Sequence, residues 1–155
     1  MANAPKIRMA VASLALSASA LVGIAVHEGY VGETYKDIVG VPTIGFGETQ
    51  GVRLGDRTDP VRALIQLDKT TSEFSKRVAS CIKVPVSQNE FDAYVSFAYN
   101  VGTGGFCGST LVKKLNASDY DGACSELLKW VYAGGKPVQG LVNRRQKEYQ
   151  QCIGN

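Results

Sequence analysis

The sequence has little of what several kinds of functional site require. It contains one histidine, His27, in 155 residues. That excludes a histidine-rich metal site and any catalytic triad that needs a histidine elsewhere. The four cysteines show no C-x-x-C spacing, so a zinc site is not expected. There is no phosphate-binding loop and no basic-aromatic stripe, and the net charge of +3 is too small to indicate nucleic acid. We therefore expect no metal, no cofactor and no nucleic-acid partner.

Charged residues are absent from one long stretch, residues 9–26, with the sequence MAVASLALSASALVGIAV. Lys6 and Arg8 precede it and Glu28 follows it. As a helix it would rise about 27 Å, against roughly 30 Å for the hydrocarbon core of a bilayer. Ala, Ser and Gly make up ten of its eighteen residues, so its insertion is weak. The basic flank predicts a cytoplasmic N-terminus with the rest of the chain outside.

The residues alone leave several accounts of this stretch open. A cleaved signal peptide is one, because Ala18–Ala20 is an A-x-A site, although cleavage there leaves only seven residues before Glu28. A permanent membrane anchor is another. A buried helix of a soluble protein is the third, but it does not account for the flanking charges.

Two acidic residues and a threonine follow the apolar stretch. Asp37 lies nine residues after Glu28, and Thr43 lies six residues beyond Asp37. A glycosidase needs one carboxyl group to protonate the leaving oxygen and a second to stabilise or activate the nucleophile. Residues 35–46 mix strand-favouring residues with Gly and Pro, which predicts a β-hairpin. With the turn centred on Gly40, Asp37 and Thr43 would face each other across the strands and hold one water.

The run around these residues closely resembles the active-site signature of the phage-type lysozymes, the endolysins of tailed bacteriophages and their prophage relatives. The resemblance continues downstream and covers nearly everything after residue 27. It implies an α+β, mostly helical, two-lobed fold with a small hairpin lobe, a long linking helix and a helical C-terminal lobe. The matching residues are Glu28, Gly29, Tyr35, Lys36, Asp37, Gly40, Thr43, Ile44, Gly45 and Gly47, followed by the segments 96–106, 109–124, 127–136 and 140–149.

The resemblance assigns the catalytic roles. Glu28 matches the general acid, Asp37 the second carboxylate, and Thr43 the hydroxyl that helps to position the attacking water. It implies an inverting displacement, which needs about 6.5 to 9.5 Å between the two carboxyl groups to admit that water. The family often has His after T-I-G-x-G, whereas this chain has Glu48 there. The sequence gives Glu48 no role.

Other positions match substrate-cleft residues of the family. Asn100 is expected to contact amino-sugar acetamido groups, with a helix cap as the alternative. Gly45 and Gly47 are expected to line the substrate. Arg144 or Arg145 is expected to approach the active-site carboxylates, with a solvated helix face as the alternative.

The resemblance also favours a signal-arrest-release segment for residues 9–26, as in a subclass of endolysins. The chain then divides into a membrane segment, residues 1–27, and a lysozyme domain, residues 28–155. Such a protein faces the periplasm from the inner membrane and becomes soluble there after release, which depends on a holin or pinholin. While tethered, Glu28 would lie at the lipid headgroups, away from the other catalytic residues.

The expected activity is therefore that of a monomeric muramidase that cuts the β-1,4 bond between N-acetylmuramic acid and N-acetylglucosamine in peptidoglycan. The pI of 8.7 suits an anionic wall polymer. A lytic transglycosylase is the enzymatic alternative, but it uses one acid and no activating water, so Asp37 and Thr43 speak against it. A membrane-tethered wall-binding protein without catalysis is the other alternative, and it would not need Glu28.

Local signals predict four further helices. They are a helix opened by Asp59-Pro60 with an apolar stripe at Val61, Leu64, Leu67, Phe74, Val78 and Ile82; one opened by a Ser87–Glu90 capping box and stopped by Gly102; one from Ser118 or Asp119 to Gly134-Gly135; and one over residues 138–152.

The four cysteines of an exported chain fit two disulfides. Three pairings are possible, and reduced buried thiols are the alternative. We favour Cys81 with Cys107 and Cys124 with Cys152, because each of these pairs joins neighbouring helical elements.

Overall fold

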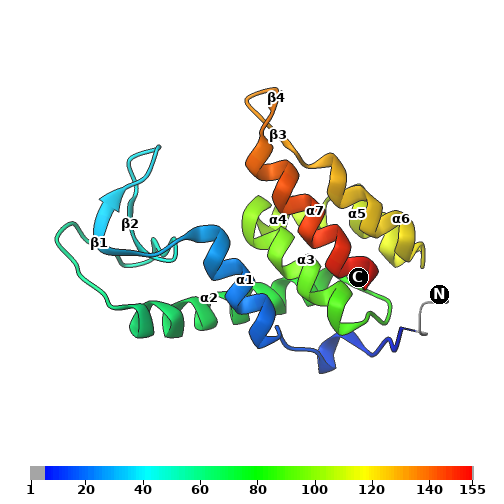
Figure 1. The fold of residues 1–155 in the computed structure, drawn as a ribbon. Coiled ribbons are helices and arrows are strands. Elements are labelled where there is room, and N and C mark those ends of the chain that lie inside the picture. Colours follow the sequence, from blue (N-terminus) through cyan, green and yellow to red (C-terminus); the bar gives the residue numbers. More distant parts are fainter. Residues whose placement is uncertain (1–5, 155) are drawn as a thin grey trace. The chain divides into compact units, whose positions relative to one another are not determined.

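The computed structural model describes residues 6–154, and the chain divides into two compact units (Figure 1). We call Ala18–Ser72 the hairpin unit. Met1–Ser17 and Glu73–Asn155 together form the helical unit, of which residues 1–5 and 155 lie outside the described part. The predicted α+β, mostly helical fold with a small hairpin lobe is confirmed.

The hairpin unit begins with α1, Ala18–Glu28, and continues into two antiparallel strands, β1, Val31–Lys36, and β2, Pro42–Gly45. It ends with the first part of α2, Pro60–Cys81. The predicted hairpin is present, but its first strand starts earlier than the expected residue 35.

The register of the hairpin differs from the predicted one. Tyr35 pairs with Thr43 and Lys36 pairs with Pro42, so the turn is centred on Val39 and not on Gly40. The cause is the Asp37 side chain, which accepts hydrogen bonds from the backbone N–H groups two and four residues further on. This side-chain turn closes the chain one residue earlier than glycine placement suggested.

Helix α2 starts where the sequence predicts. The Asp59 carboxylate accepts hydrogen bonds from the N–H groups two and three residues ahead, at 3.0 Å each. The predicted apolar stripe is correct at Leu67, which is buried, but wrong at Val61 and Leu64, which are exposed. The helix turns Ala63 inward instead, because a small side chain is needed where the turn after β2 comes close.

The helical unit is built around α3, Gln88–Val101, whose Phe91, Tyr94 and Phe97 side chains are fully buried. Helix α7, Gln139–Ile153, packs against it (Figure 1). The remaining elements are a 3-10 turn at Val11–Ser13, the second part of α2, α4 (Thr103–Cys107), α5 (Thr110–Asn116), α6 (Tyr120–Glu126), a 3-10 turn at Leu127–Lys129, and strands β3 (Tyr132–Ala133) and β4 (Lys136–Pro137).

The predicted helix ends of this unit are partly correct. The Ser87–Glu90 capping box is present, and Gly102, with φ of +84°, closes α3. Asp119 caps α6 as expected. However, α6 ends at Glu126, and Gly134-Gly135 forms the two-residue turn between β3 and β4. Both glycines have positive φ, which such hairpin turns require.

Both favoured disulfides are present. Cys81–Cys107 joins the end of α2 to α4, with a Cα–Cα distance of 5.5 Å. Cys124–Cys152 joins α6 to α7, with a Cα–Cα distance of 5.7 Å. All four cysteines lie in the helical unit.

The apolar stretch 9–26 is not one helix in this structure. A 3-10 turn and an extended segment precede α1, and the boundary between the two units falls after Ser17. Within residues 6–154, none of the helices combines the length and the apolar character that crossing a membrane requires. The side chains of Val11, Leu14 and Leu16 pack on the core of the helical unit, and those of Ala20, Ile24 and Ala25 are buried.

Candidate active site

Glu28, the candidate acid, is the last residue of α1 and is half-buried. Gly29 ends the helix: its φ is +72°, and its N–H donates to the carbonyl of Ala25 at 3.0 Å. The Glu28 carboxyl lies against Gly47, where an added Cβ would be 3.3 Å from Oε2. The E-G pair of the motif therefore has a structural basis, because glycine lets the chain turn directly after the acid.

Asp37 lies in the turn between β1 and β2. Its Oδ1 accepts hydrogen bonds from the N–H groups of Val39, at 2.9 Å, and Val41, at 2.8 Å. Within residues 6–154, no hydrogen bond uses its Oδ2. One carboxylate oxygen thus fixes the turn, and the other is available to a water or a sugar hydroxyl.

Thr43 lies on β2 and is 4% exposed. Its hydroxyl donates to the carbonyl of Val41 at 2.9 Å, so its oxygen can accept a hydrogen bond from a water. The peptide groups on either side of Val41 therefore connect Asp37 with Thr43. The predicted arrangement, in which the two side chains face each other across the strands, is wrong because Thr43 pairs with Tyr35.

Glu48 is a residue to which sequence reasoning gave no role. It is half-buried, and its carboxylate has donors on both oxygens. Oε1 accepts from the N–H groups of Thr49 and Gln50 at 2.9 and 2.7 Å. Oε2 accepts from Thr70 Oγ1 at 2.8 Å and Gln66 Nε2 at 3.1 Å, both on α2. Burial alone would raise the pKa of Glu48, but these hydrogen bonds lower it below its ordinary value.

Of the remaining candidates, Asn100, Arg144 and Arg145 lie in the helical unit. Asn100 is exposed in the last turn of α3, and Gly102, not Asn100, closes that helix. The cap alternative for Asn100 is therefore not supported. In the hairpin unit, Gly45 and Gly47 both have positive φ. Their role toward a substrate stays a prediction, as does that of Asn100.

Arg144 and Arg145 are buried, so a solvated helix face is the wrong description of both. Their Nε atoms lie 3.2 and 2.7 Å from the two carboxylate oxygens of Glu148, which also accepts from Ser96 Oγ at 2.8 Å. Arg145 also covers the ring of Phe97. Burial raises the pKa of Glu148 and lowers the pKa of Arg145. The expected approach of either arginine to the active-site carboxylates stays a prediction.

Metal ligands do not cluster in the part of the chain that the structure describes. Among residues 6–154, no three His, Cys, Asp or Glu side chains come together in a way that could hold a metal ion.

Comparisons with known proteins agree with the motifs. Residues 25–148 match the family described as Phage lysozyme. A SAR-endolysin of Enterobacteria phage PA-2 is 35% identical, over 96% of this chain and 96% of the relative. A SAR-endolysin of Pseudomonas phage phiKMV is 40% identical, over 88% and 87%. The solved endolysin of Escherichia coli O157:H7 phage FAHEc1 has a TM-score of 0.82 and 33% identity, over 96% and 97% of the two chains.

Proposed function

Because the chain belongs to the phage lysozyme family, we propose that it is an endolysin that hydrolyses the β-1,4 bond between N-acetylmuramic acid and N-acetylglucosamine in peptidoglycan. One observation carries the proposal. A carboxyl group at the end of α1 and a carboxylate joined to a hydroxyl through Val41 occur in one compact unit, at the positions of the family signature. These are the groups that glycoside hydrolysis requires.

In the proposed reaction, Glu28 donates a proton to the leaving O4 of N-acetylglucosamine. A water attacks C1 of N-acetylmuramic acid from the opposite face, which inverts its configuration. Asp37, whose Oδ1 is held by two N–H groups, accepts the proton of that water. Thr43 orients the water by accepting a hydrogen bond from it, since the Thr43 hydroxyl proton is directed to the carbonyl of Val41.

Substitution of Glu28 tests the enzymatic proposal. Glu28→Gln keeps the shape of the side chain but removes the proton donor, and should reduce clearing of permeabilised cells about a hundredfold or more. Glu33→Gln is the matched control, because Glu33 is an exposed glutamate of the same unit. If Glu28→Gln clears cells at the rate of the unchanged protein, Glu28 is not the acid and the enzymatic proposal as stated is wrong.

We further propose that residues 9–26 hold the exported protein in the inner membrane until a holin or pinholin permits release into the periplasm. The weak apolarity of this stretch and the SAR-endolysin names of its relatives support this. In the membrane, the helical segment that ends at Glu28 would be withdrawn from the hairpin unit. The tethered form is then inactive, and release restores α1.

Added leucines test the release step. Ala15 and Ala18 are exposed, so Ala15→Leu with Ala18→Leu raises membrane affinity with little effect on packing. We expect the doubly substituted protein to stay in the membrane fraction and to delay lysis. Ala117→Leu with Ala133→Leu adds the same two side chains at exposed positions elsewhere. Unchanged lysis timing and unchanged fractionation of the first pair would contradict release as the control step.

A further inference from the structure

The turn Ile44–Glu48 packs on both of its sides. Its two end residues exchange backbone hydrogen bonds of 2.9 Å. On one side, Gly45 approaches α2 so closely that an added Cβ would be 3.1 Å from the Cβ of Ala63. On the other side, Gly47 lies against the carboxyl group of Glu28. A displacement of this turn away from α2 would therefore move the surface on which the Glu28 carboxyl rests.

The carboxylate of Glu48 holds the turn in that place. One of its oxygens is bound by two N–H groups of the chain that follows the turn, and the other by two side chains of α2. Four hydrogen bonds therefore fix this carboxylate between its own loop and α2. We propose that Glu48 is a positioning residue for Glu28, acting through the turn and Gly47.

This inference rests on the proposed role of Glu28 as the acid. Glu48 is directed to α2 and to its own loop, so it need not contact the substrate. Loss of the Glu48 carboxylate should therefore impair the chemical step more than substrate binding. A misplacement of about 1 Å in a catalytic group can cost about a hundredfold in rate.

The test compares Glu48→Ala with Glu48→Gln. Alanine removes all four hydrogen bonds and should lower kcat about tenfold to a hundredfold, with KM changed less than about twofold. Glutamine keeps an oxygen for the loop N–H groups and can donate its amide to Thr70, so it should restore most of kcat. Both kcat values are expressed per folded molecule, with the folded fraction measured by circular dichroism at the assay temperature.

Three outcomes decide the matter. Glu33→Ala, which removes an exposed carboxylate of the same unit, should leave kcat unchanged. If Glu48→Ala loses only folded fraction and keeps kcat per folded molecule, Glu48 is a stability residue and the inference is wrong. If Glu28→Gln keeps full activity, the proposed function itself fails, whatever Glu48 does.

A second inference comes from the N-terminal arm, which we define as residues 6–17. Met9 and Val86 exchange two backbone hydrogen bonds, of 2.9 and 3.0 Å. Ser17 donates its N–H and its hydroxyl to Asp92 at 3.0 and 2.6 Å. Both ends of the arm are thus hydrogen-bonded to residues at or just before the start of α3.

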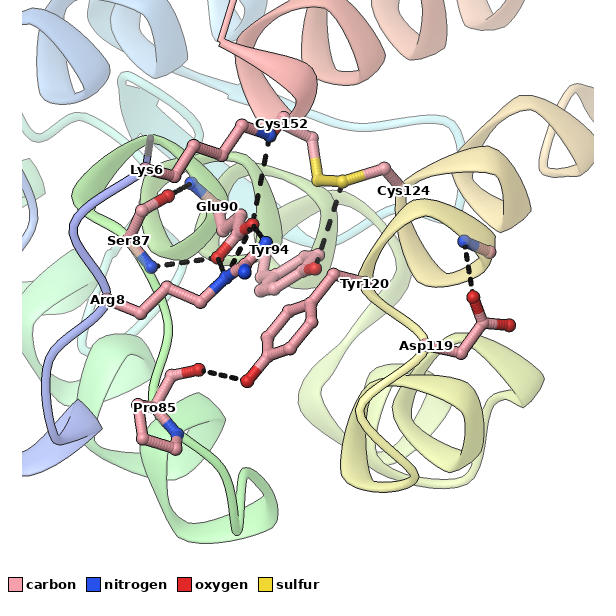
Figure 2. Close-up of polar contacts among 11 residues, drawn as sticks. Lys6, Arg8, Pro85, Ser87, Glu90, Tyr94, Asp119, Tyr120, Cys124 and Cys152 are labelled. Carbon is pink, nitrogen blue, oxygen red and sulfur yellow. Dashed lines mark hydrogen bonds and ion pairs between the residues drawn. A yellow bond between two sulfur atoms is a disulfide. The ribbon is translucent and has the colours of Figure 1, made fainter. Parts of the chain in front are cut away.

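The strongest attachment is an ion pair between Arg8 and Glu90 (Figure 2). Nη2 of Arg8 donates to Oε1 at 2.7 Å, and Nε lies 3.1 and 3.2 Å from the two oxygens. The guanidinium also lies over the ring of Tyr120, 3.5 Å from its centroid. Lys6 donates to the carbonyl of Cys152 at 3.0 Å and lies 3.9 Å from Glu90 Oε1. The Glu90 side chain is 0% exposed.

Lys6 and Arg8 are the cations that precede the apolar stretch. In the tethered state proposed above, they lie on the cytoplasmic side, and Glu90 faces the periplasm without them. We infer that Glu90 is the docking site that captures this basic flank after release. The same two charges would then set the membrane orientation first and fix the released form afterwards.

Trypsin, which cleaves after Lys and Arg, tests the capture on the soluble protein. Glu90→Gln removes the charge but keeps a residue that serves in the capping box with Ser87. We expect cleavage after Arg8 to become about tenfold faster. Glu126→Gln is the control, because Glu126 is a buried ion-paired carboxylate that does not contact the arm.

Equal cleavage rates at Arg8 in the Glu90→Gln and unchanged proteins would overturn the capture. The assay needs no membrane and no wall substrate. Its result is therefore independent of the release step and of the catalytic proposal.

Discussion

Glu48 of the hairpin unit and Glu90 of the helical unit are both carboxylates that hold neighbouring segments by hydrogen bonds. Their donors differ in how far away they lie in the sequence. The Glu48 carboxylate is half-buried and the Glu90 carboxylate is fully buried, and hydrogen bonds lower the pKa of both. Glu48 is bound by residues no more than 22 positions away. Glu90 is bound by Arg8, which is 82 positions away on the arm. The local set can form whenever its unit folds, whereas the remote set also needs the arm in place.

The two carboxylates should therefore affect different properties: Glu48 the geometry of the candidate active site, and Glu90 the attachment of the N-terminal arm. Loss of the hydrogen bonds to Glu48 should alter the geometry around Glu28 whenever α1 is folded into the hairpin unit. Loss of the Arg8 contact should weaken the helical unit and free the arm without a change in the reaction.

Arg8→Ala should have the largest effect on stability. It leaves the Glu90 carboxylate buried without its nearer ion-pair partner, and the loss of such a partner costs about 3 to 5 kcal/mol in comparable cases. The single tryptophan, Trp130, lies in the helical unit, so its fluorescence during urea unfolding reports on that unit. Arg8→Ala combined with Glu90→Gln should recover most of the loss. A loss below about 1 kcal/mol would mean that water or Lys6 replaces Arg8 at Glu90.

Removal of the Cys124–Cys152 disulfide should cost slightly less. The bond closes a loop of sequence separation 28, which corresponds to about 3.5 kcal/mol. The comparison predicts that Cys124→Ala with Cys152→Ala weakens the helical unit and leaves the Glu48 contacts intact. Hydrogen exchange at the amides of Thr49 and Gln50 measures the second part. Faster exchange there in this variant would show that the two units are not independent.

Glu48→Ala should destabilise the hairpin unit by about 2 kcal/mol, the scale of hydrogen bonds to a charged, half-buried group. The same two amides, of Thr49 and Gln50, should lose protection. The Trp130 transition should move less than in Arg8→Ala. A larger shift than in Arg8→Ala would reverse the comparison.

The pH dependence should identify the charge on Glu90. The titratable groups that interact with it are Arg8, Lys6 and Tyr94, and Tyr120 lies against the Arg8 guanidinium. Burial alone would raise the pKa of Glu90, and the hydrogen bonds from Arg8 are the main cause that lowers it. A lowered pKa stabilises the folded state above the ordinary value of 4.5, and this stability disappears as the pH falls through the folded value. The stability difference between the unchanged protein and Glu90→Gln should be full at pH 7 and should shrink below about pH 4.5. A difference that stays constant down to pH 2 would exclude an ionised Glu90.

The smallest effect is expected at the exposed pair of Glu33 and Arg57, whose nitrogen and oxygen lie 2.7 Å apart. Exposed ion pairs contribute little, so Glu33→Ala should change the free energy of unfolding by about 0.5 kcal/mol or less. A larger loss would mean that burial does not distinguish this pair from Glu48 and Glu90.

Features with a local cause were predictable from the sequence. The Ser87–Glu90 box and the Asp59 cap lie within four residues of the backbone groups they bind, so their patterns can be read directly. The signature around Glu28 identified the family by its resemblance to the phage-type lysozymes, and its glycine has a local cause, the positive φ of Gly29 directly after the acid. The disulfide pairing followed from the order of the helices.

Features with a remote or side-chain cause were not predictable. The hairpin register depends on how the Asp37 carboxylate closes the turn. The spacing of glycines in the sequence does not reveal this side-chain contact. The proposed role of Glu48 depends on which face of α2 is turned toward its loop, because that face carries Gln66 and Thr70. Arg8 suggested only a membrane orientation, because its partner is far away in the chain and was already explained as part of a capping box.

The central claim is that Glu28, Asp37 and Thr43 together direct a water onto a wall glycosidic bond. Digestion of purified peptidoglycan in water enriched in oxygen-18, followed at once by borohydride reduction and mass spectrometry, tests it most directly. The account predicts one heavy oxygen at each new N-acetylmuramic acid end, and no products with Glu28→Gln. Anhydro ends without the label would contradict it and assign the chain to the lytic transglycosylases.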